Sequence, residues 1–318
     1  MQHHAKHFNR NHRTIPDTFD DRLKLSKNHP AIIFENRTIT FNELNDLSNQ
    51  IAEWGLNVAK LQPGDVVGLL CDNCIEYIAI WLGLSKIGCT TSLINTNLKG
   101  DPLLHSFTVV ETKLIISGLS NNLSDNVNEI KSKLLEHNNQ LQFWYINDTG
   151  NHNIAIKHYG LQSLNDSLTQ FNIKSGDTSY NHKYHQLRQQ AKLNSSNLLF
   201  YIYTSGTTGL PKAAKIKHTR MFLAGISFVT MHALNKRDIL YVSMPLYHSA
   251  AGMIGVGVSW LGGITIVLRR KFSAKSFMSD CAIHNVTVIQ YIGQICRYLI
   301  STEPSRYDKQ HKIKKAIG

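Results

Sequence analysis

The stretch Val66-Val-Gly-Leu-Leu70 is apolar throughout and follows the turn-forming residues Pro63-Gly64-Asp65, so it predicts a buried strand. Residues 76–87 have the pattern of a helix that ends at Gly88, and residues 89–94 form a second apolar run. A strand, a helix and a strand in this order predict a β-α-β unit with parallel strands.

The same alternation extends from this unit in both directions. Before it, residues 31–34 and 37–40 predict a hairpin, and Thr40-Phe-Asn-Glu43 has the spacing of a capping box for a helix that stops near Gly55. After it, we expect a helix from Pro102 and a strand over residues 114–117. These elements predict a first α/β lobe at residues 31–146, with a parallel sheet covered on both faces, after an N-terminal extension at residues 1–30.

Residues 147–196 have no such periodicity. They are rich in Asn, Gln, Ser, His and Lys, which predicts a poorly ordered polar insertion or connection. The alternation resumes with a strand over residues 198–203, and it predicts a second α/β lobe at residues 197–300. Residues 301–318 are expected to form a solvated basic tail.

Residues 250–268 carry no charge and precede Arg269-Arg-Lys271, so a transmembrane helix has to be considered. The alternative is a buried helix over residues 250–260, a turn at Gly262-Gly263 and a strand over residues 264–268. The glycines within the stretch and the β-branched run Ile264-Thr-Ile-Val267 favour this alternative.

The composition is that of a globular protein, because 42% of the 318 residues are hydrophobic. A formal net charge of +12 favours anionic partners such as nucleotides, acidic membrane surfaces or nucleic acids. The Lys and Arg residues are dispersed and no nucleic-acid motif accompanies them, so no nucleic-acid partner is expected.

The five cysteines form an odd and clumped set that resembles no disulfide framework, which favours a reducing compartment. Cys71 and Cys74 form a C-x-x-C pair, but no second pair follows, so two ordinary thiols at a strand end are favoured over a metal site. No secretory signal is visible in residues 1–30. A cytoplasmic protein is therefore expected.

The segment Thr204-Ser-Gly-Thr-Thr-Gly-Leu-Pro-Lys212 follows the strand over residues 198–203 and carries the chemistry. Gly206 and Gly209 allow the backbone amides to converge on phosphate oxygens, and Lys212 adds a positive charge. Further hydrogen-bond donors are the hydroxyl groups of Thr204, Ser205, Thr207 and Thr208. The segment therefore predicts a loop that binds polyphosphate and does not act as a nucleophile.

A P-loop requires a glycine immediately before its lysine, and Pro211 occupies that position here. The segment instead resembles, over nine consecutive positions, the signature motif of the adenylate-forming (AMP-binding) superfamily. Pro245-Leu-Tyr-His-Ser-Ala250 resembles the second motif of that superfamily. Residues 93–99, 268–274 and 288–299 resemble its fatty acid transport protein branch, the very long-chain acyl-CoA synthetases.

The resemblance implies an α/β fold, the large N-terminal domain of an adenylate-forming enzyme, with two stacked lobes and mostly parallel sheets. It also implies a long-chain or very long-chain fatty acid-CoA ligase linked to fatty acid uptake. In such an enzyme the fatty carboxylate attacks the α-phosphate of ATP and expels pyrophosphate, and the thiol of coenzyme A then displaces AMP. ATP, coenzyme A and the Mg²⁺ that accompanies ATP are thus the implied cofactors and co-substrates.

By the same resemblance, Lys212 and His248 would be catalytic, and Tyr247 and His248 would lie near the acyl carboxylate. Tyr291 and Gly293 would border the acyl tunnel, although residues 286–290 alternate as in an ordinary core strand. An isolated histidine is more often a surface or core residue, so the role of His248 depends on the motif around it.

Two departures from the family pattern limit what the resemblance implies. Gln294 stands where this branch usually carries Glu, and everything that the family carries beyond the strand expected at residues 312–318 is missing from the sequence. We therefore expect the truncated, amino-terminal part of an acyl-CoA synthetase, with a non-catalytic fatty acid- or nucleotide-binding remnant as the alternative. The expected location is the cytoplasm or the cytosolic face of the endoplasmic reticulum, the peroxisome or the plasma membrane.

Overall fold

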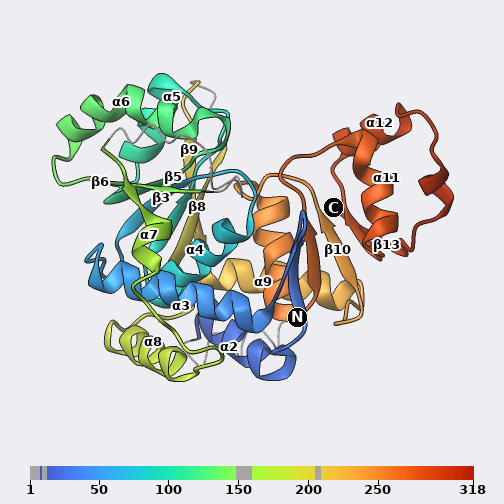
Figure 1. The fold of residues 1–318 in the computed structure, drawn as a ribbon, viewed down its shortest axis with the longest axis horizontal. Helices are drawn as coiled ribbons and strands as arrows, with labels where there is room; N and C mark the ends of the chain where they lie inside the picture. Colours follow the sequence, from blue (N-terminus) through green and yellow to red (C-terminus); the bar gives the residue numbers. More distant parts are fainter. Residues whose placement is uncertain (1–7, 9–12, 148–159, 205–208) are drawn as a thin grey trace.

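The computed structural model describes residues 8, 13–147, 160–204 and 209–318, which form two β-sheets and the helices around them (Figure 1). The seven-stranded sheet has the order β7-β6-β5-β3-β4-β8-β9. Its strands are β3 (Val66–Leu70), β4 (Thr90–Leu93), β5 (Leu114–Gly118), β6 (Gln142–Ile146), β7 (Gln162–Ser163), β8 (Leu198–Thr204) and β9 (Lys212–Lys217). All neighbours in it are parallel except β8 and β9, and the β-α-β unit around Val66-Val-Gly-Leu-Leu70 is confirmed.

The six-stranded sheet has the order β13-β12-β10-β11-β1-β2. Its strands are β1 (Pro30–Phe34), β2 (Arg37–Thr40), β10 (Ile239–Val242), β11 (Thr265–Leu268), β12 (Val288–Gln290) and β13 (Lys315–Ile317). The hairpin of β1 and β2 is antiparallel, as predicted, and the other neighbours are parallel.

The two sheets do not follow the linear division into residues 31–146 and 197–300. The hairpin at residues 30–40 pairs through β1 with β11, and β8 pairs with β4. Both β4 and β11 are buried along their whole length, so each needs a hydrogen-bonding partner on its open edge. The tail at residues 301–318 is not solvated throughout either, because β13 extends the sheet and buries Ile317.

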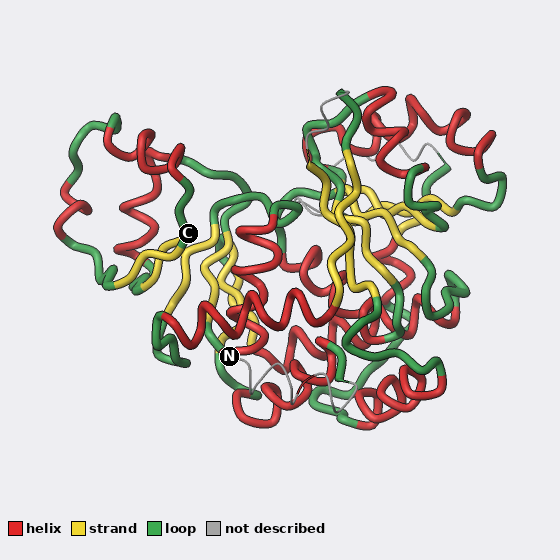
Figure 2. Tube along the Cα trace, turned by 180° about the vertical axis from the view of Figure 1, so that it is seen from behind, coloured by secondary structure: helices red, strands yellow, loops and turns green. Residues whose placement is uncertain are grey.

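Helices lie between the two sheets and on their outer faces (Figure 2). The α-helices are α2 (Ile15–Ser26), α3 (Phe41–Asn57), α4 (Ile75–Lys86), α5 (Gly100–Thr108), α6 (Leu123–His137), α7 (Leu164–Leu168), α8 (Ser179–Gln190), α9 (His218–Met231), α10 (Gly257–Gly262), α11 (Ala274–Ile283) and α12 (Gly293–Ile300). Two short 3₁₀ turns are η1 (Ser120–Asn122) and η3 (Arg306–Lys309), and η2 (Ser249–Val256) is a π-helix.

The capping box predicted at the start of α3 is present, with Thr40 accepting a hydrogen bond from the backbone of Glu43 at 3.2 Å. The predicted stop at Gly55 is wrong, because α3 continues to Asn57. A Cβ atom at Gly55 would lie 2.9 Å from Cδ1 of Ile87, so this glycine permits close packing inside the helix.

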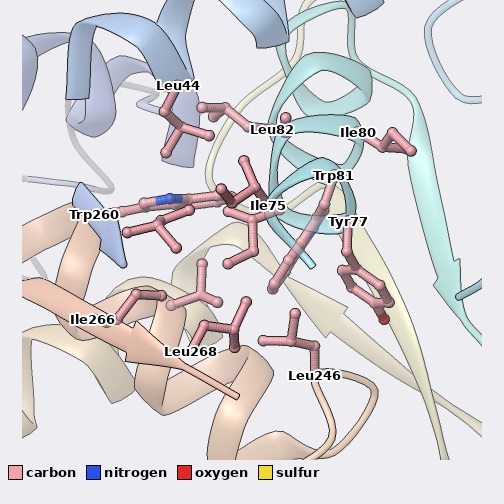
Figure 3. Close-up of a cluster of buried hydrophobic side chains, with 14 of the residues drawn as sticks. Leu44, Ile75, Tyr77, Ile80, Trp81, Leu82, Leu246, Trp260, Ile266 and Leu268 are labelled. Atoms are coloured by element: carbon pink, nitrogen blue, oxygen red, sulfur yellow. The ribbon is translucent and has the colours of Figure 1, made fainter. Parts of the chain in front are cut away.

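Trp81 of α4 lies where the two sheets are joined. Its ring centroid lies 4.8 Å from that of Phe200 in β8 and 5.3 Å from that of Trp260 in α10. Ile266 and Leu268 of β11 lie in the same buried cluster (Figure 3). Because apolar side chains from both sheets are removed from water together, this cluster holds the sheets against one another.

The polar segment at residues 147–196 includes α8, which contradicts its predicted poor order over the described part; residues 148–159 lie outside the described ranges. Arg188 of α8 is buried, donates to the carbonyl oxygen of Lys86 at 2.7 Å and pairs with Asp17 at 2.5 Å. The ammonium of Lys86 donates to Oδ1 of Asn45 at 2.7 Å and of Asn49 at 2.6 Å. Burial lowers the pKa of Lys86 to about 7.

The uncharged stretch at residues 250–268 forms η2, α10 and β11, so the buried helix-turn-strand alternative is confirmed. Gly263 takes the left-handed conformation at the turn, with φ of 69°. Among the described residues, no helix has both the length and the apolar character needed to span a bilayer.

Candidate active site

The carboxyl ends of strands from both sheets meet at one place. The side chain of Asn97, in the loop after β4, donates a hydrogen bond to the hydroxyl of Tyr247, in the loop after β10, at 3.3 Å. A Cβ atom at Gly252 of η2 would lie 3.9 Å from Cδ1 of Leu93, the last residue of β4. In open α/β sheets, ligands bind in the crevice outside the carboxyl ends of the strands, so this junction is the candidate site.

The predicted phosphate loop leaves β8 at this same edge, because β8 runs parallel to β4. Thr204 ends β8 opposite Lys212, which begins β9, and both side chains are exposed. Gly209 has φ of 83°, a conformation that favours glycine even though an added Cβ would meet no atom within 4 Å. Ser205, Gly206, Thr207 and Thr208 lie outside the described residues.

Lys212 lines a cavity of about 520 Å³ together with Lys215, Tyr201 and Glu111. Among the described residues Lys212 has no salt-bridge partner, and the lining of this cavity includes neither Tyr247 nor His248. A point charge at the end of a glycine-containing turn is suited to phosphate oxygens.

Tyr203 fixes the strand that leads into the loop. Its hydroxyl lies 2.6 Å from that of Ser92 in β4 and donates to the carbonyl oxygen of Ser106 in α5 at 2.5 Å. Burial raises the pKa of Tyr203 well above its usual value, so the hydroxyl keeps its proton for this hydrogen bond. The end of β8 is therefore held by both β4 and α5.

Tyr247 and His248 lie side by side, with ring centroids 4.9 Å apart. Tyr247 is buried, which raises the pKa of its hydroxyl, whereas His248 is exposed. Partial burial lowers the pKa of His248, so its imidazole is neutral at pH 7 and can donate one hydrogen bond. The structure thus brings the two predicted acyl-site residues together.

The π-helix η2 begins immediately after His248. Gly252 is required within it, because a Cβ there would lie 2.2 Å from the carbonyl oxygen of Leu246. At its first turn, the carbonyl oxygen of Ala250 accepts a hydrogen bond from Nε2 of buried Gln290 in β12 at 2.7 Å. Single π-helical segments are often found at functional sites.

Tyr291 and Gly293 lie just beyond β12, whose last residue Gln290 contacts η2. Tyr291 is 37% exposed, and a Cβ at Gly293 would meet no atom within 4 Å. Gly293 therefore faces open space, whereas the ring of Tyr291 lies against Gly318, and the predicted place of both residues at an acyl tunnel stays a prediction. Gln294, in the first turn of α12, is exposed.

Three residues that support this junction were not predicted as site residues: Asn97, Gln290 and Asn73, whose side chain donates hydrogen bonds to the carbonyl oxygens of Met244 and Arg269 at 2.9 Å. Each is a polar residue just beyond the carboxyl end of a strand or at its last position. That position is the signal that could have identified them, because side chains at this edge converge. The strand assignment alone, however, gives no partner for any of them.

Two other features do not mark the site. A larger cavity, of about 1100 Å³, lies between α2 and α8 and contains none of the predicted site residues. Cys71 and Cys74 are buried with their sulfur atoms 3.7 Å apart, and Sγ of Cys74 accepts a hydrogen bond from the backbone of Tyr77 at the start of α4. In the part of the chain that the structure describes, no group of three or more His, Cys, Asp or Glu residues is arranged to hold a metal ion.

Comparison with curated proteins finds relatives of this chain. The chain is 35% identical over 306 residues to long-chain fatty acid transport protein 2 of Rattus norvegicus, a match that covers 96% of this chain and 46% of the relative. It is 31% identical over 300 residues to a very long-chain fatty acid transport protein of Cochliobolus heterostrophus, covering 94% of this chain and 42% of that protein. The chain therefore spans about half the length of the curated relatives it matches.

Solved structures show the same fold. The N-terminal domain of FACL13 from Mycobacterium tuberculosis superposes with a TM-score of 0.73 at 21% identity, over 96% of this chain and 69% of that one. A fatty acyl CoA synthetase of the same organism gives a TM-score of 0.75 at 18% identity, over 95% of this chain and 54% of that one. The family model described as "AMP-binding enzyme" matches residues 19–317. The chain therefore belongs to the AMP-binding enzyme family.

Proposed function

We propose that this chain provides the ATP- and fatty acid-binding part of a long-chain or very long-chain fatty acid-CoA ligase, linked to fatty acid uptake. The observation that carries the proposal is the junction of the two sheets. The loop between Thr204 and Lys212 leaves one sheet at the edge where Tyr247 and His248 of the other sheet lie.

The first step brings two anions together, the fatty carboxylate and the triphosphate of ATP. Lys212 and the donors of the loop, Thr204, Ser205, Thr207, Thr208 and the amides near Gly206 and Gly209, offset the repulsion and hold the phosphates in line for attack. Mg²⁺ would arrive bound to ATP and screen the same charge. Bound fatty acid would place its carboxylate near Tyr247 and His248, where the neutral imidazole donates a hydrogen bond to the acyl-phosphate oxygen.

The acyl chain would extend toward Tyr291 and Gly293, where no side chain fills the space beside the glycine. Coenzyme A would enter in the second step and displace AMP. The protein would lie in the cytoplasm or at the cytosolic face of a membrane, where a protein linked to fatty acid transport, as its relatives are named, would meet its substrate.

The proposal is tested by ATP–pyrophosphate exchange driven by a long-chain fatty acid. Lys212→Ala should lower the exchange rate by about a hundredfold, the usual effect of removing one preorganised transition-state donor. Lys217→Ala is the matched control, because Lys217 is an exposed lysine at the other end of β9. Equal exchange in the two variants would contradict the proposal, and nucleotide binding without any exchange would support a non-catalytic binding protein of the same fold.

A further inference from the structure

Asn73 forms three hydrogen bonds that connect one sheet to the ends of two strands of the other. It lies between β3 and α4, and its side chain is buried at 4% exposure. Its Nδ2 donates to the carbonyl oxygens of Met244 and Arg269, each at 2.9 Å, and its Oδ1 accepts from the backbone of Leu246 at 2.8 Å. Both amide protons and the carbonyl oxygen are thus used.

The three backbone groups lie directly after β10 and β11, which are parallel neighbours. Met244 and Leu246 flank Pro245, so Asn73 forms hydrogen bonds with the backbone on both sides of the proline. Tyr247 and His248 are the next two residues. The path of the backbone into the candidate acyl site is therefore set by a side chain from the opposite sheet.

Asn73 is itself held in place. The turn that carries it runs from Cys71 to Cys74, and Cys74 caps α4 through the backbone amide of Tyr77. Tyr77 and Leu246 belong to the same buried cluster (Figure 3). The anchor and the segment that it holds are therefore both packed in the core.

We propose that Asn73 is a positioning residue for the fatty carboxylate. It fixes the segment from Met244 to Leu246 so that Tyr247 and His248 meet the carboxylate at the edge where the phosphate loop lies. This inference rests on the proposed function and deepens it. It says that a residue outside the acyl site, Asn73, fixes the positions of the side chains that contact the fatty carboxylate.

The inference predicts a specific kinetic pattern. Asn73→Ala should lower kcat/KM for the fatty acid by about 10- to 100-fold, because small misplacements of binding groups have effects of this size. The KM for ATP should stay within about twofold, since the phosphate loop is held by β4 and α5 through Tyr203. Asn73→Asp keeps the acceptor for Leu246 but turns a carboxylate toward two carbonyl oxygens, so it should be no better than Asn73→Ala.

The matched control is Asn181→Ala. Asn181 of α8 is also buried and also forms three side-chain hydrogen bonds, to Asp20 at 2.5 Å, Asn45 at 3.1 Å and Asn49 at 3.3 Å. Asn181→Ala should therefore lose about as much stability as Asn73→Ala, but its KM for the fatty acid should equal that of the wild type.

The outcomes separate this inference from the proposed function. If the wild-type chain exchanges pyrophosphate and Asn73→Ala behaves like Asn181→Ala, the inference is wrong and the function stands. If the wild-type chain binds neither MgATP nor fatty acid, the function fails, and hydrogen–deuterium exchange over residues 244–252 decides the inference. Faster hydrogen–deuterium exchange of residues 244–252 in Asn73→Ala, but not in Asn181→Ala, supports the inference. Equal hydrogen–deuterium exchange of these residues in the two variants overturns it. Should Asn73→Ala not fold, Asn73→Ser and Asn73→Asp allow the same comparison.

Discussion

Nδ2 of Asn97 donates a hydrogen bond to the hydroxyl of Tyr247 at 3.3 Å, across 150 positions of sequence. Asn97 follows β4 of the seven-stranded sheet, and Tyr247 follows β10 of the six-stranded sheet. The contact therefore joins the two sheets at the edge where β8, the strand that leads into the predicted phosphate loop, also ends.

This contact should appear as an energetic coupling. Tyr247→Phe removes the acceptor and Asn97→Ala removes the donor. Asn97→Ala should therefore lower the free energy of unfolding by about 0.5 to 1 kcal/mol less in the Tyr247→Phe variant than in the wild type. Urea unfolding of the two single variants and the double variant measures this difference. Tyr203→Phe is the control tyrosine, because its hydroxyl contacts Ser92 and Ser106 instead. Additive effects of Tyr247→Phe and Asn97→Ala would show that the contact contributes nothing.

Gly252 and Gly293 differ in the space that is available to an added side-chain carbon. Gly252→Ala should destabilise the chain by about 1 to 3 kcal/mol, because the new methyl group would lie 2.2 Å from a carbonyl oxygen in the site loop. Gly293→Ala should stay within about 0.5 kcal/mol of the wild type, since nothing lies within 4 Å of its added carbon. Thermal or urea unfolding of both variants tests this, and equal stabilities would contradict the packing described around η2.

His218 predicts a specific loss of stability in acid. Nδ1 of this buried imidazole accepts a hydrogen bond from the backbone of Ile15 at 3.1 Å, and burial lowers the pKa of His218 to about 3. Between about pH 6.5 and pH 3 the unfolded chain binds this proton and the folded chain does not. The free energy of unfolding therefore falls as the pH falls, by about 1.4 kcal/mol per pH unit from this group.

The substitution His218→Asn keeps a hydrogen-bond acceptor for Ile15 and removes the titration. Urea unfolding at pH 6 and pH 5 should show the wild type losing about 1 kcal/mol more than the variant over this interval. Parallel pH profiles of the two proteins would mean that His218 has the same pKa in the folded and the unfolded chain, which would contradict the lowered pKa.

The local elements and the turn that joins β8 to β9 could be predicted from the sequence, because their signals are local, whereas the phosphate-binding role of that turn stays a prediction. The capping box at Thr40, the apolar run from Val66 and the loop from Thr204 to Lys212 each depend on residues within one short segment. The helix stop predicted at Gly55 is nevertheless wrong, because glycine is favoured both where helices end and where they pack closely, and Gly55 lies within α3.

The pairing of strands could not be predicted in the same way. The strand β1 pairs with β11, and β8 pairs with β4, although the paired segments are far apart in the sequence. Such pairing depends on the packing of the whole chain and not on any local signal. The same is true of Arg188, whose polar surroundings in sequence gave no sign that its partners, Lys86 and Asp17, would lie in the interior. Asn73 was missed for this reason as well, since all three of its partners are more than 170 residues away.

The claim that the segment from Thr204 to Lys212 binds the triphosphate of ATP is tested most directly by calorimetric titration with MgATP. The account predicts saturable binding to one site of the wild-type chain, about tenfold or more weaker in Lys212→Ala and unchanged in Lys217→Ala, because a hydrogen bond to a charged group is worth about 1.5 to 3 kcal/mol. No heat of binding with the folded wild type, or equal affinity in wild type and Lys212→Ala, would contradict it.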